Sequence, residues 1–261
     1  MKSAIVLLIC FFSFSYPTVS YAKKKKKAEI VSDNSLKYEN LHGKVKSVSE
    51  RVYDILNGKH NLLSNSISFY NQQGYITYNN EYSSKDSSFQ RQKKYIYDQN
   101  FHLTGTLDSF AAGYITFTIF RNNAKGQDTA SAFFTKGVNG TKFVSNATMA
   151  YNDKGQMIER KEFHAENKLQ SRTTNVYDVD GNLAEFTVYT PDNLIKDRLA
   201  YKYDKKRNKI ETISYDNTGM IKSKYNYEYK DFDKKGNWQT FIRYQEGKAQ
   251  FMENRAIEYF Q

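Results

Sequence analysis

The sequence predicts an all-β protein, an antiparallel meander of tandem β-hairpins forming a curved or coiled sheet of roughly 14 to 16 strands of ordinary length. Three observations predict this fold. The 261 residues include 22 Tyr and 18 Phe but only 2 Pro, and aromatic side chains favour pleated, half-buried surfaces. A tyrosine followed by Asp or Asn recurs along the chain. Apolar residues alternate with polar ones, and no helical period recurs.

The first 22 residues have the features of a secretory signal peptide. An apolar run extends from Ala4 to Phe12, and the small residues Ser20 and Ala22 stand where signal peptidase requires them. The run is shorter than the ~20 residues of a membrane-spanning helix. We therefore expect residues 1–22 to be removed and the mature chain to be exported.

Residues 23–43 are predicted to form a Lys-rich tail and linker. Five consecutive lysines, Lys23 to Lys27, contribute much of the net charge of +11. This run is either a solvated linker or an attachment to an anionic membrane surface, worth ~1 kcal/mol per lysine near the surface. The single cysteine, Cys10, lies in the signal segment, so the mature chain has no disulfide, thiolate nucleophile or Cys metal ligand.

An aromatic residue before Asp or Asn marks each predicted hairpin. The repeat returns every 26 residues from Tyr151 to Tyr177 to Tyr203. The predicted structural anchors are Tyr70, Tyr97, Tyr151, Tyr177, Tyr203 and Phe232.

A turn is predicted directly after each anchor. The Asp or Asn side chain can bond the turn backbone, and the residue four positions after the anchor must accept a left-handed conformation. Phe101 and Arg207 stand at this position in two repeats, and glycine stands there in the others: Gly74, Gly155, Gly181 and Gly236. A second aromatic and a second turn follow in most repeats, so each repeat is expected to hold two strands.

Aromatic residues occupy alternate positions in the segment 221–229. Tyr225, Tyr227 and Tyr229 therefore share one face of a strand and are candidate ligand-face residues, because their rings can stack on sugars. Ordinary sheet packing is the alternative interpretation. The stretch from about Gly113 to Met149 lacks the tyrosine anchor. We assign residues 44–261 to one β-hairpin repeat domain.

These units resemble YD repeats, the β-hairpin repeats of Rhs-type proteins and of many small exported proteins of Gram-negative bacteria. The resemblance rests on Tyr151–Met157, Tyr177–Leu183 and Phe232–Trp238, and it covers the chain from Tyr70 to the C-terminus. Large members coil their repeats into a shell around a toxin domain, for which this chain has too few repeats. The resemblance also implies carbohydrate binding.

No motif in the sequence supports catalysis or metal binding. The segment 178–182 resembles a calcium loop, but the position of Gly181 and the presence of Tyr189 in place of the bidentate Glu do not fit one. The four histidines form no metal-binding pair, and no phosphate loop or nucleophile motif is present. We expect no catalytic residue, metal or cofactor, and no enzyme activity. Export and the concentration of charge in the tail argue against nucleic acid as a partner.

Glu159, Glu185 and Glu211 occupy the same position in three successive repeats. Paired carboxylates can hydrolyse glycosides. Basic residues such as Lys161 lie alongside, however, and favour solvated cross-strand ion pairs.

The predicted function is a non-catalytic binding or interaction module of the bacterial envelope, located in the periplasm, on the cell surface or outside the cell. Its aromatic sheet face would meet a glycan or an envelope protein, and Lys23 to Lys27 would meet an anionic membrane. An outer-membrane β-barrel is the alternative, suggested by the signal peptide, the strand alternation and Phe260 near the C-terminus. A lipid-facing barrel requires an outward apolar band, whereas these strands are rich in charge.

Overall fold

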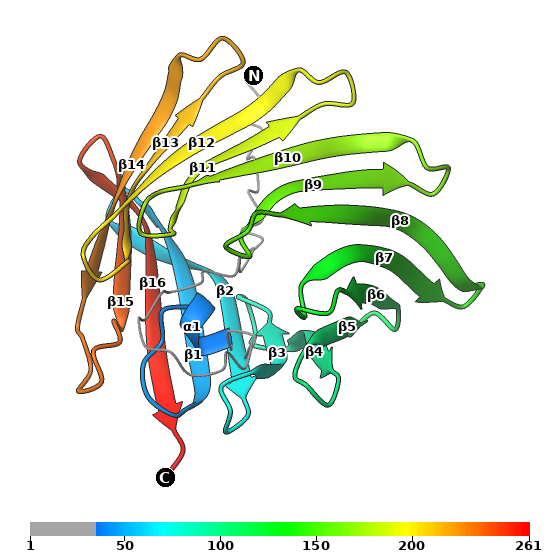
Figure 1. Ribbon diagram of the computed structural model, residues 1–261. Coiled ribbons are helices and arrows are strands. Elements are labelled where there is room, and N and C mark those ends of the chain that lie inside the picture. The colour runs from blue at the N-terminus through cyan, green and yellow to red at the C-terminus, as the bar shows by residue number, and fades with distance from the viewer. Residues whose placement is uncertain (1–34) are drawn as a thin grey trace, which may run out of the picture.

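Sixteen antiparallel strands follow one another along the chain and form one closed barrel (Figure 1). The computed structural model describes residues 35–261. The strands are β1 (Val45–Leu56), β2 (Lys59–Tyr70), β3 (Ile76–Tyr82), β4 (Phe89–Tyr97), β5 (Leu103–Phe110), β6 (Ile115–Asn122), β7 (Asp128–Gly137), β8 (Gly140–Tyr151), β9 (Met157–His164), β10 (Leu169–Tyr177), β11 (Leu183–Tyr189), β12 (Ile195–Tyr203), β13 (Lys209–Tyr215), β14 (Ile221–Lys230), β15 (Thr240–Gln245) and β16 (Lys248–Tyr259).

The expected all-β meander and its strand number are confirmed, but the sheet is not an open curved or coiled one. β1 pairs with β16 from Val45 opposite Tyr259 to Asp54 opposite Phe251. Closure gives every strand two partners and removes the unpaired edges that an open sheet must protect. This pairing joins the two ends of the domain, so no local pattern in the sequence predicts it.

The turns that follow the predicted anchors all lie at one end of the barrel, which we call the anchor end. In each turn the backbone N–H of the fourth residue donates to the carbonyl of the first, which is Asp or Asn. In the β12–β13 turn the Asp204 Oδ1 also accepts the N–H groups of Lys206 and Asn208. The fourth residue has a positive φ even where it is not glycine, as at Phe101 (60°) and Arg207 (66°).

Tyrosine hydroxyls tie successive hairpins together at this end. Each donates to the carbonyl of the first residue of a strand in the preceding hairpin, at 2.8 to 3.1 Å. The pairs are Tyr97 with Ile76, Tyr151 with Asp128, Tyr177 with Met157, Tyr203 with Leu183 and Tyr229 with Lys209.

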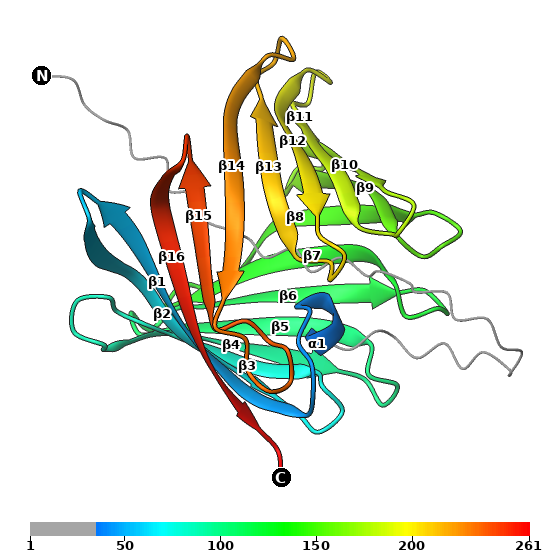
Figure 2. The ribbon, with the colours of Figure 1, turned by 90° about the vertical axis from the view of Figure 1, so that its left-hand side faces the viewer.

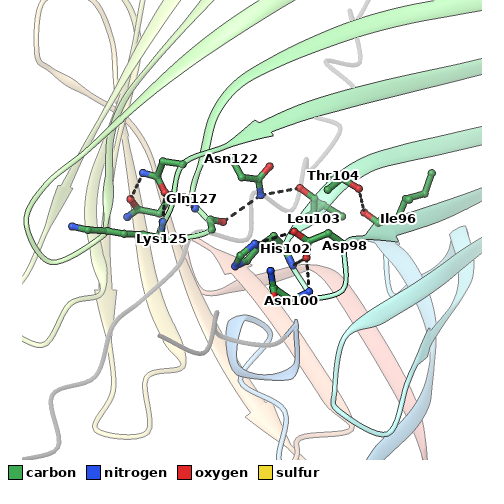
Figure 3. A network of polar contacts seen from close by, with 11 residues as sticks. Ile96, Asp98, Asn100, His102, Leu103, Thr104, Asn122, Lys125 and Gln127 are labelled. Carbon is green, nitrogen blue, oxygen red and sulfur yellow. Dashed lines mark hydrogen bonds and ion pairs between the residues drawn. The ribbon is translucent and has the colours of Figure 1, made fainter. Parts of the chain in front are cut away.

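The stretch that lacks a tyrosine anchor keeps the same bond through Asn122. Its Nδ2 donates to the carbonyl of Leu103 at 3.2 Å (Figure 3). In the same region the His102 ring lies with its Nδ1 3.1 Å from the Asp98 Oδ2. A shorter side chain thus makes the connection that tyrosine makes elsewhere.

Gly126, in the β6–β7 turn, should tolerate alanine less well than Gly219 in the β13–β14 turn. Both have positive φ, 76° and 87°. A Cβ at Gly126 would collide with the His102 ring, whereas one at Gly219 would meet nothing within 4 Å. We expect about 1–2 kcal/mol of destabilisation from φ in both variants, and about 1–3 kcal/mol more in Gly126→Ala from the collision. Urea unfolding measures both; equal losses would contradict this prediction.

The predicted signal peptide, residues 1–22, and Lys23 to Lys27 lie outside the described residues. Residues 35–43, expected to belong to a linker, are instead part of the fold. They include the short helix α1 (Ser35–Tyr38). Residues 35–44, which we call the crossing segment, lie across the anchor end (Figure 2).

The crossing segment is bonded to distant parts of the rim. The Leu36 N–H donates to the Gly74 carbonyl in the β2–β3 turn at 3.2 Å. The Asn40 Nδ2 donates to the Lys206 carbonyl in the β12–β13 turn at 3.1 Å, and the His42 N–H donates to the Asn237 Oδ1 in the β14–β15 turn at 2.7 Å. The β2–β3 turn lies on one side of the β1–β16 pair and the other two turns lie on its other side, so the segment crosses the rim above the place where the barrel closes.

The hydrophobic core lies directly beneath the crossing segment. Leu36 and Leu41 are 7% exposed and pack with Val45, Val48 and residues of β2 and β3. Most side chains that face the interior farther along the strands remain partly exposed. The packed core is therefore confined to one end of the barrel.

Candidate functional site

The inner face of the sheet can be followed from strand to strand. Val48, in the core beneath the crossing segment, marks the inner face of β1. Residues two apart in a strand, and residues directly opposite in neighbouring strands, point to the same face. Glu50, two residues from Val48, therefore faces inward, and so does Arg255, which lies opposite it on β16. Glu253, two residues from Arg255, faces inward together with Phe241, opposite it on β15, and Phe241 together with Tyr229, opposite it on β14.

The candidate ligand-face residues Tyr225, Tyr227 and Tyr229 therefore lie on the inner face of β14. Further rings surround them, with centroids 5.3 Å apart for Tyr227 and Phe241 and 5.4 Å apart for Tyr229 and Trp238. We call the whole set the aromatic wall: Tyr225, Tyr227, Tyr229, Trp238, Phe241 and Phe251. Every ring in it is partly exposed, so the wall borders the solvent-accessible interior.

Three cations lie over rings of the aromatic wall. The Arg255 guanidinium is 3.7 Å from the Trp238 centroid. The Arg243 guanidinium lies 5.1 Å from the Tyr225 ring and 4.9 Å from the Phe251 ring. The Lys209 Nζ lies 5.2 Å from the Tyr227 ring and 5.4 Å from that of Tyr201 on β12.

An acidic cluster joins the crossing segment to the barrel wall. The Tyr70 hydroxyl donates to the Glu39 Oε2 at 2.7 Å. The Arg255 Nε donates to the Glu50 Oε1 at 2.9 Å and to the Glu253 Oε1 at 3.1 Å. Burial raises the pKa of Glu39 and raises that of Glu253 to about 7. Within residues 35–261, Arg255 is the cation that bonds Glu50 and Glu253 and whose charge also acts on Glu39.

Glu253 should make the protein less stable as the pH rises. A carboxyl whose pKa is raised by folding contributes stability that is present below its unfolded value near 4.5 and is lost as the pH rises through about 7. We expect Glu253→Gln to weaken this slope between roughly pH 5 and 8. Glu258→Gln, an exposed carboxyl in the same strand, should keep it. Urea unfolding across this range measures the slope; an unchanged slope in Glu253→Gln would contradict the assignment.

Several partly buried cations on the inner face are paired with acids. The Arg91 Nη1 lies 3.2 Å from the Asp108 Oδ1, and Arg91 also pairs with Glu81. The Lys93 Nζ lies 3.8 Å from the Asp108 Oδ2. Arg160 pairs with Glu162 on β9. These residues form two balanced groups away from the aromatic wall.

The outer face of β9 to β14 carries ion pairs. The three glutamates predicted to share a repeat position each meet a base on a neighbouring strand: Glu159 with Arg172 at 3.5 Å, Glu185 with Arg198 at 2.7 Å, and Glu211 with Lys202 and Lys224 at 2.8 Å. None of these carboxylates is paired with another carboxylate in the described structure, so the geometry of a glycosidase site does not arise there.

The outer face of β5 to β8 is more apolar. Leu107 lies opposite Phe117, Phe117 opposite Phe134, and Phe134 opposite Phe143. The rings of Phe117 and Phe134 stack with centroids 4.9 Å apart. Ile119 extends this outward patch and is 53% exposed.

The predicted anchors differ in what they contact. Tyr97, Tyr151, Tyr177 and Tyr203 end strands and make the carbonyl bonds described above, whereas Tyr70 bonds Glu39. Phe232 lies beyond the end of β14 and is 43% exposed; Tyr229, three residues earlier, makes the anchor bond in its place. The turn glycines Gly74, Gly155, Gly181 and Gly236 all have positive φ.

Within residues 35–261, no group of three or more His, Cys, Asp or Glu side chains is arranged to hold a metal ion. None of the helices in that part of the chain is both long enough and apolar enough to cross a membrane.

The barrel resembles solved structures. A porin-like protein from Bacteroides uniformis ATCC 8492 matches with a TM-score of 0.54 and 13% identity, over 82% of this chain and 98% of that one. A porin-like protein from Bacteroides vulgatus ATCC 8482 matches with a TM-score of 0.47 and 13% identity, over 80% and 97% of the two chains. A Photorhabdus luminescens Tc holotoxin pore matches over 80% of this chain and 13% of that one, with 12% identity and a TM-score of only 0.33. No protein-family model matches the sequence, and no curated protein matches it. The first likeness shows a common barrel fold.

Proposed function

We propose that the protein is an exported, non-catalytic binding barrel of the bacterial envelope, which takes up a glycan against the aromatic wall. The observation that carries this proposal is the position of the wall, on the inner face of a closed barrel and partly exposed. Barrels of about this strand number leave an interior too wide for side chains to fill. Exposed aromatic rings beside polar groups are typical of ligand sites.

The ion pairs on the outer face support contact between water and the strands from β9 to β14. Charged side chains on a lipid-facing strand cost about 2–4 kcal/mol each at the bilayer midplane for Arg or Lys. The ion pairs of β9 to β14 face outward across several neighbouring strands. In water such pairs contribute little and are tolerated.

The hairpins support assignment to the YD type. The Asp or Asn of each turn, the positive φ at the fourth turn position and the tyrosine bond to the preceding hairpin recur around the barrel. In this proposal the repeats close on themselves and enclose the binding site.

An outer-membrane barrel is the second candidate. It is the alternative predicted from the sequence, and two observations support it better than they support the binding module: the likeness to the porin-like protein from Bacteroides uniformis and the apolar outward patch of β5 to β8. Cell fractionation distinguishes the two candidates. Release of the full-length protein by osmotic shock or into the medium supports the binding barrel, and extraction by detergent alone supports the membrane barrel.

Glycan binding can be measured through Trp238, the single tryptophan of the chain. We expect neutral and acidic oligosaccharides to change its fluorescence, and Tyr225→Ala to weaken the response. Tyr215→Ala is the matched control, because Arg198 lies 5.0 Å from the Tyr215 ring as Arg243 lies 5.1 Å from the Tyr225 ring, but on the outer face. Equal effects of the two substitutions, or no response to any glycan, would overturn the proposal.

A further inference from the structure

Two of the partly buried cations that the structure describes on the inner face lack a carboxylate partner. Arg91, Lys93, Arg160 and Arg255 each have a carboxylate oxygen within 4.0 Å. Lys209 and Arg243 have no such partner within residues 35–261. Both are partly buried, and their charged groups lie over aromatic rings.

The two cations flank one tyrosine. Arg243 lies directly opposite Tyr227 in the β14–β15 pair, and the Lys209 Nζ lies 5.2 Å from the Tyr227 ring. Burial lowers the pKa of Lys209, and the nearby charge of Arg243 lowers it further. The Arg243 Nε is buried and has no hydrogen-bond partner. Like charges held together away from water are unfavourable unless an anion balances them.

We propose that Lys209 and Arg243 bind the carboxylate of an acidic sugar, so that the glycan taken up by the barrel contains uronate residues. The inference rests on the proposed function and specifies its ligand. A guanidinium can hold a carboxylate with two parallel hydrogen bonds, and the ammonium adds a third donor from the other side. Tyr227, between them, offers a ring edge or face to the sugar that carries the carboxylate.

The test compares matched glycans on the full chain by calorimetry. The probes are a galacturonate trisaccharide and its neutral galactose counterpart, each at low and at physiological salt. Charge-assisted bonds contribute roughly 1.5–3 kcal/mol, so the uronate should bind about tenfold to a hundredfold more tightly than the neutral sugar. The double variant Lys209→Met with Arg243→Met should remove this preference, so that it binds the two sugars with affinities within about twofold of each other. Arg160→Met, an inner-face cation paired with Glu162, should leave both affinities unchanged.

The outcomes separate the inference from the proposed function. If both glycans bind the native protein equally, the carboxylate site is overturned while glycan binding stands. If neither binds, both are overturned. If acetate at the same concentration binds as tightly as the uronate, the site takes a free carboxylate and the sugar assignment is overturned. Should the double variant lose its β-sheet circular dichroism, Lys209→Gln alone is used, and an unchanged uronate preference in it would count against the inference.

Discussion

Arg255→Met should lower the free energy of unfolding by about 3–5 kcal/mol near neutral pH, because it leaves several carboxylates beneath the crossing segment without their cation. Arg255 bonds Glu50 and Glu253, and its side chain is only 12% exposed. Methionine retains much of the contact with the Trp238 ring while removing the charge. Urea unfolding at about pH 7 and about pH 5 measures the effect. We expect the loss to shrink at the lower pH, where Glu253, whose pKa is raised to about 7, holds a proton.

Arg198→Met is the matched control for this prediction. Arg198 also pairs with a glutamate, Glu185 at 2.7 Å, and also lies over an aromatic ring, that of Tyr215. It does so on the outer face with a side chain 39% exposed, so its loss should change stability by less than about 1 kcal/mol. Similar losses in the two variants would show that the acidic cluster is as well solvated as the surface pairs.

Leu41→Ala should destabilise the protein by about 2–5 kcal/mol, because it opens a cavity in the core that joins the crossing segment to β1 and β2. Leu41 is 7% exposed and packs within the cluster that contains Val45, Val48 and Tyr70. Thermal and urea unfolding, followed by circular dichroism, measure the loss.

Leu194→Ala serves as its control. Leu194 lies in the β11–β12 turn and is 66% exposed, so the same change of side chain should alter stability by no more than about 0.5 kcal/mol. A small effect at Leu41 would mean that the barrel folds independently of residues 35–44.

Local chemistry made the strands and turns predictable from the sequence. Asp or Asn followed by a residue at positive φ specifies a turn wherever it occurs, and even Arg207 adopts that φ because the rest of the turn requires it. Alternation placed Tyr225, Tyr227 and Tyr229 on one face, because a strand leaves no other choice. These inferences need only a few neighbouring residues.

Features that depend on distant residues were not predictable in this way. The pairing of β1 with β16 depends on the length and twist of every strand between them. The crossing segment contains a four-residue helix that has no period to detect, and its bonds reach turns far along the chain. Asn122 and Tyr229 act as anchors because of where their polar atoms reach, which spacing from the turn does not reveal.

The candidate site was partly visible in the sequence. The tyrosines of β14 could be singled out by their spacing, but Lys209 and Arg243 lie on other strands and meet Tyr227 only through the register of three strands. A basic residue on a strand rich in charge is predicted to be solvated unless the side of the sheet to which it points is known. The missing information was thus the pairing register, not the residue types.

The crossing segment bonds turns on both sides of the strand pair that closes the barrel: the β2–β3 turn on the β1 side, and the β14–β15 and β12–β13 turns on the β16 side. It therefore acts as a clasp over the seam between the first strand and the last. These two strands are held together by contacts from three other hairpins as well as by their own hydrogen bonds.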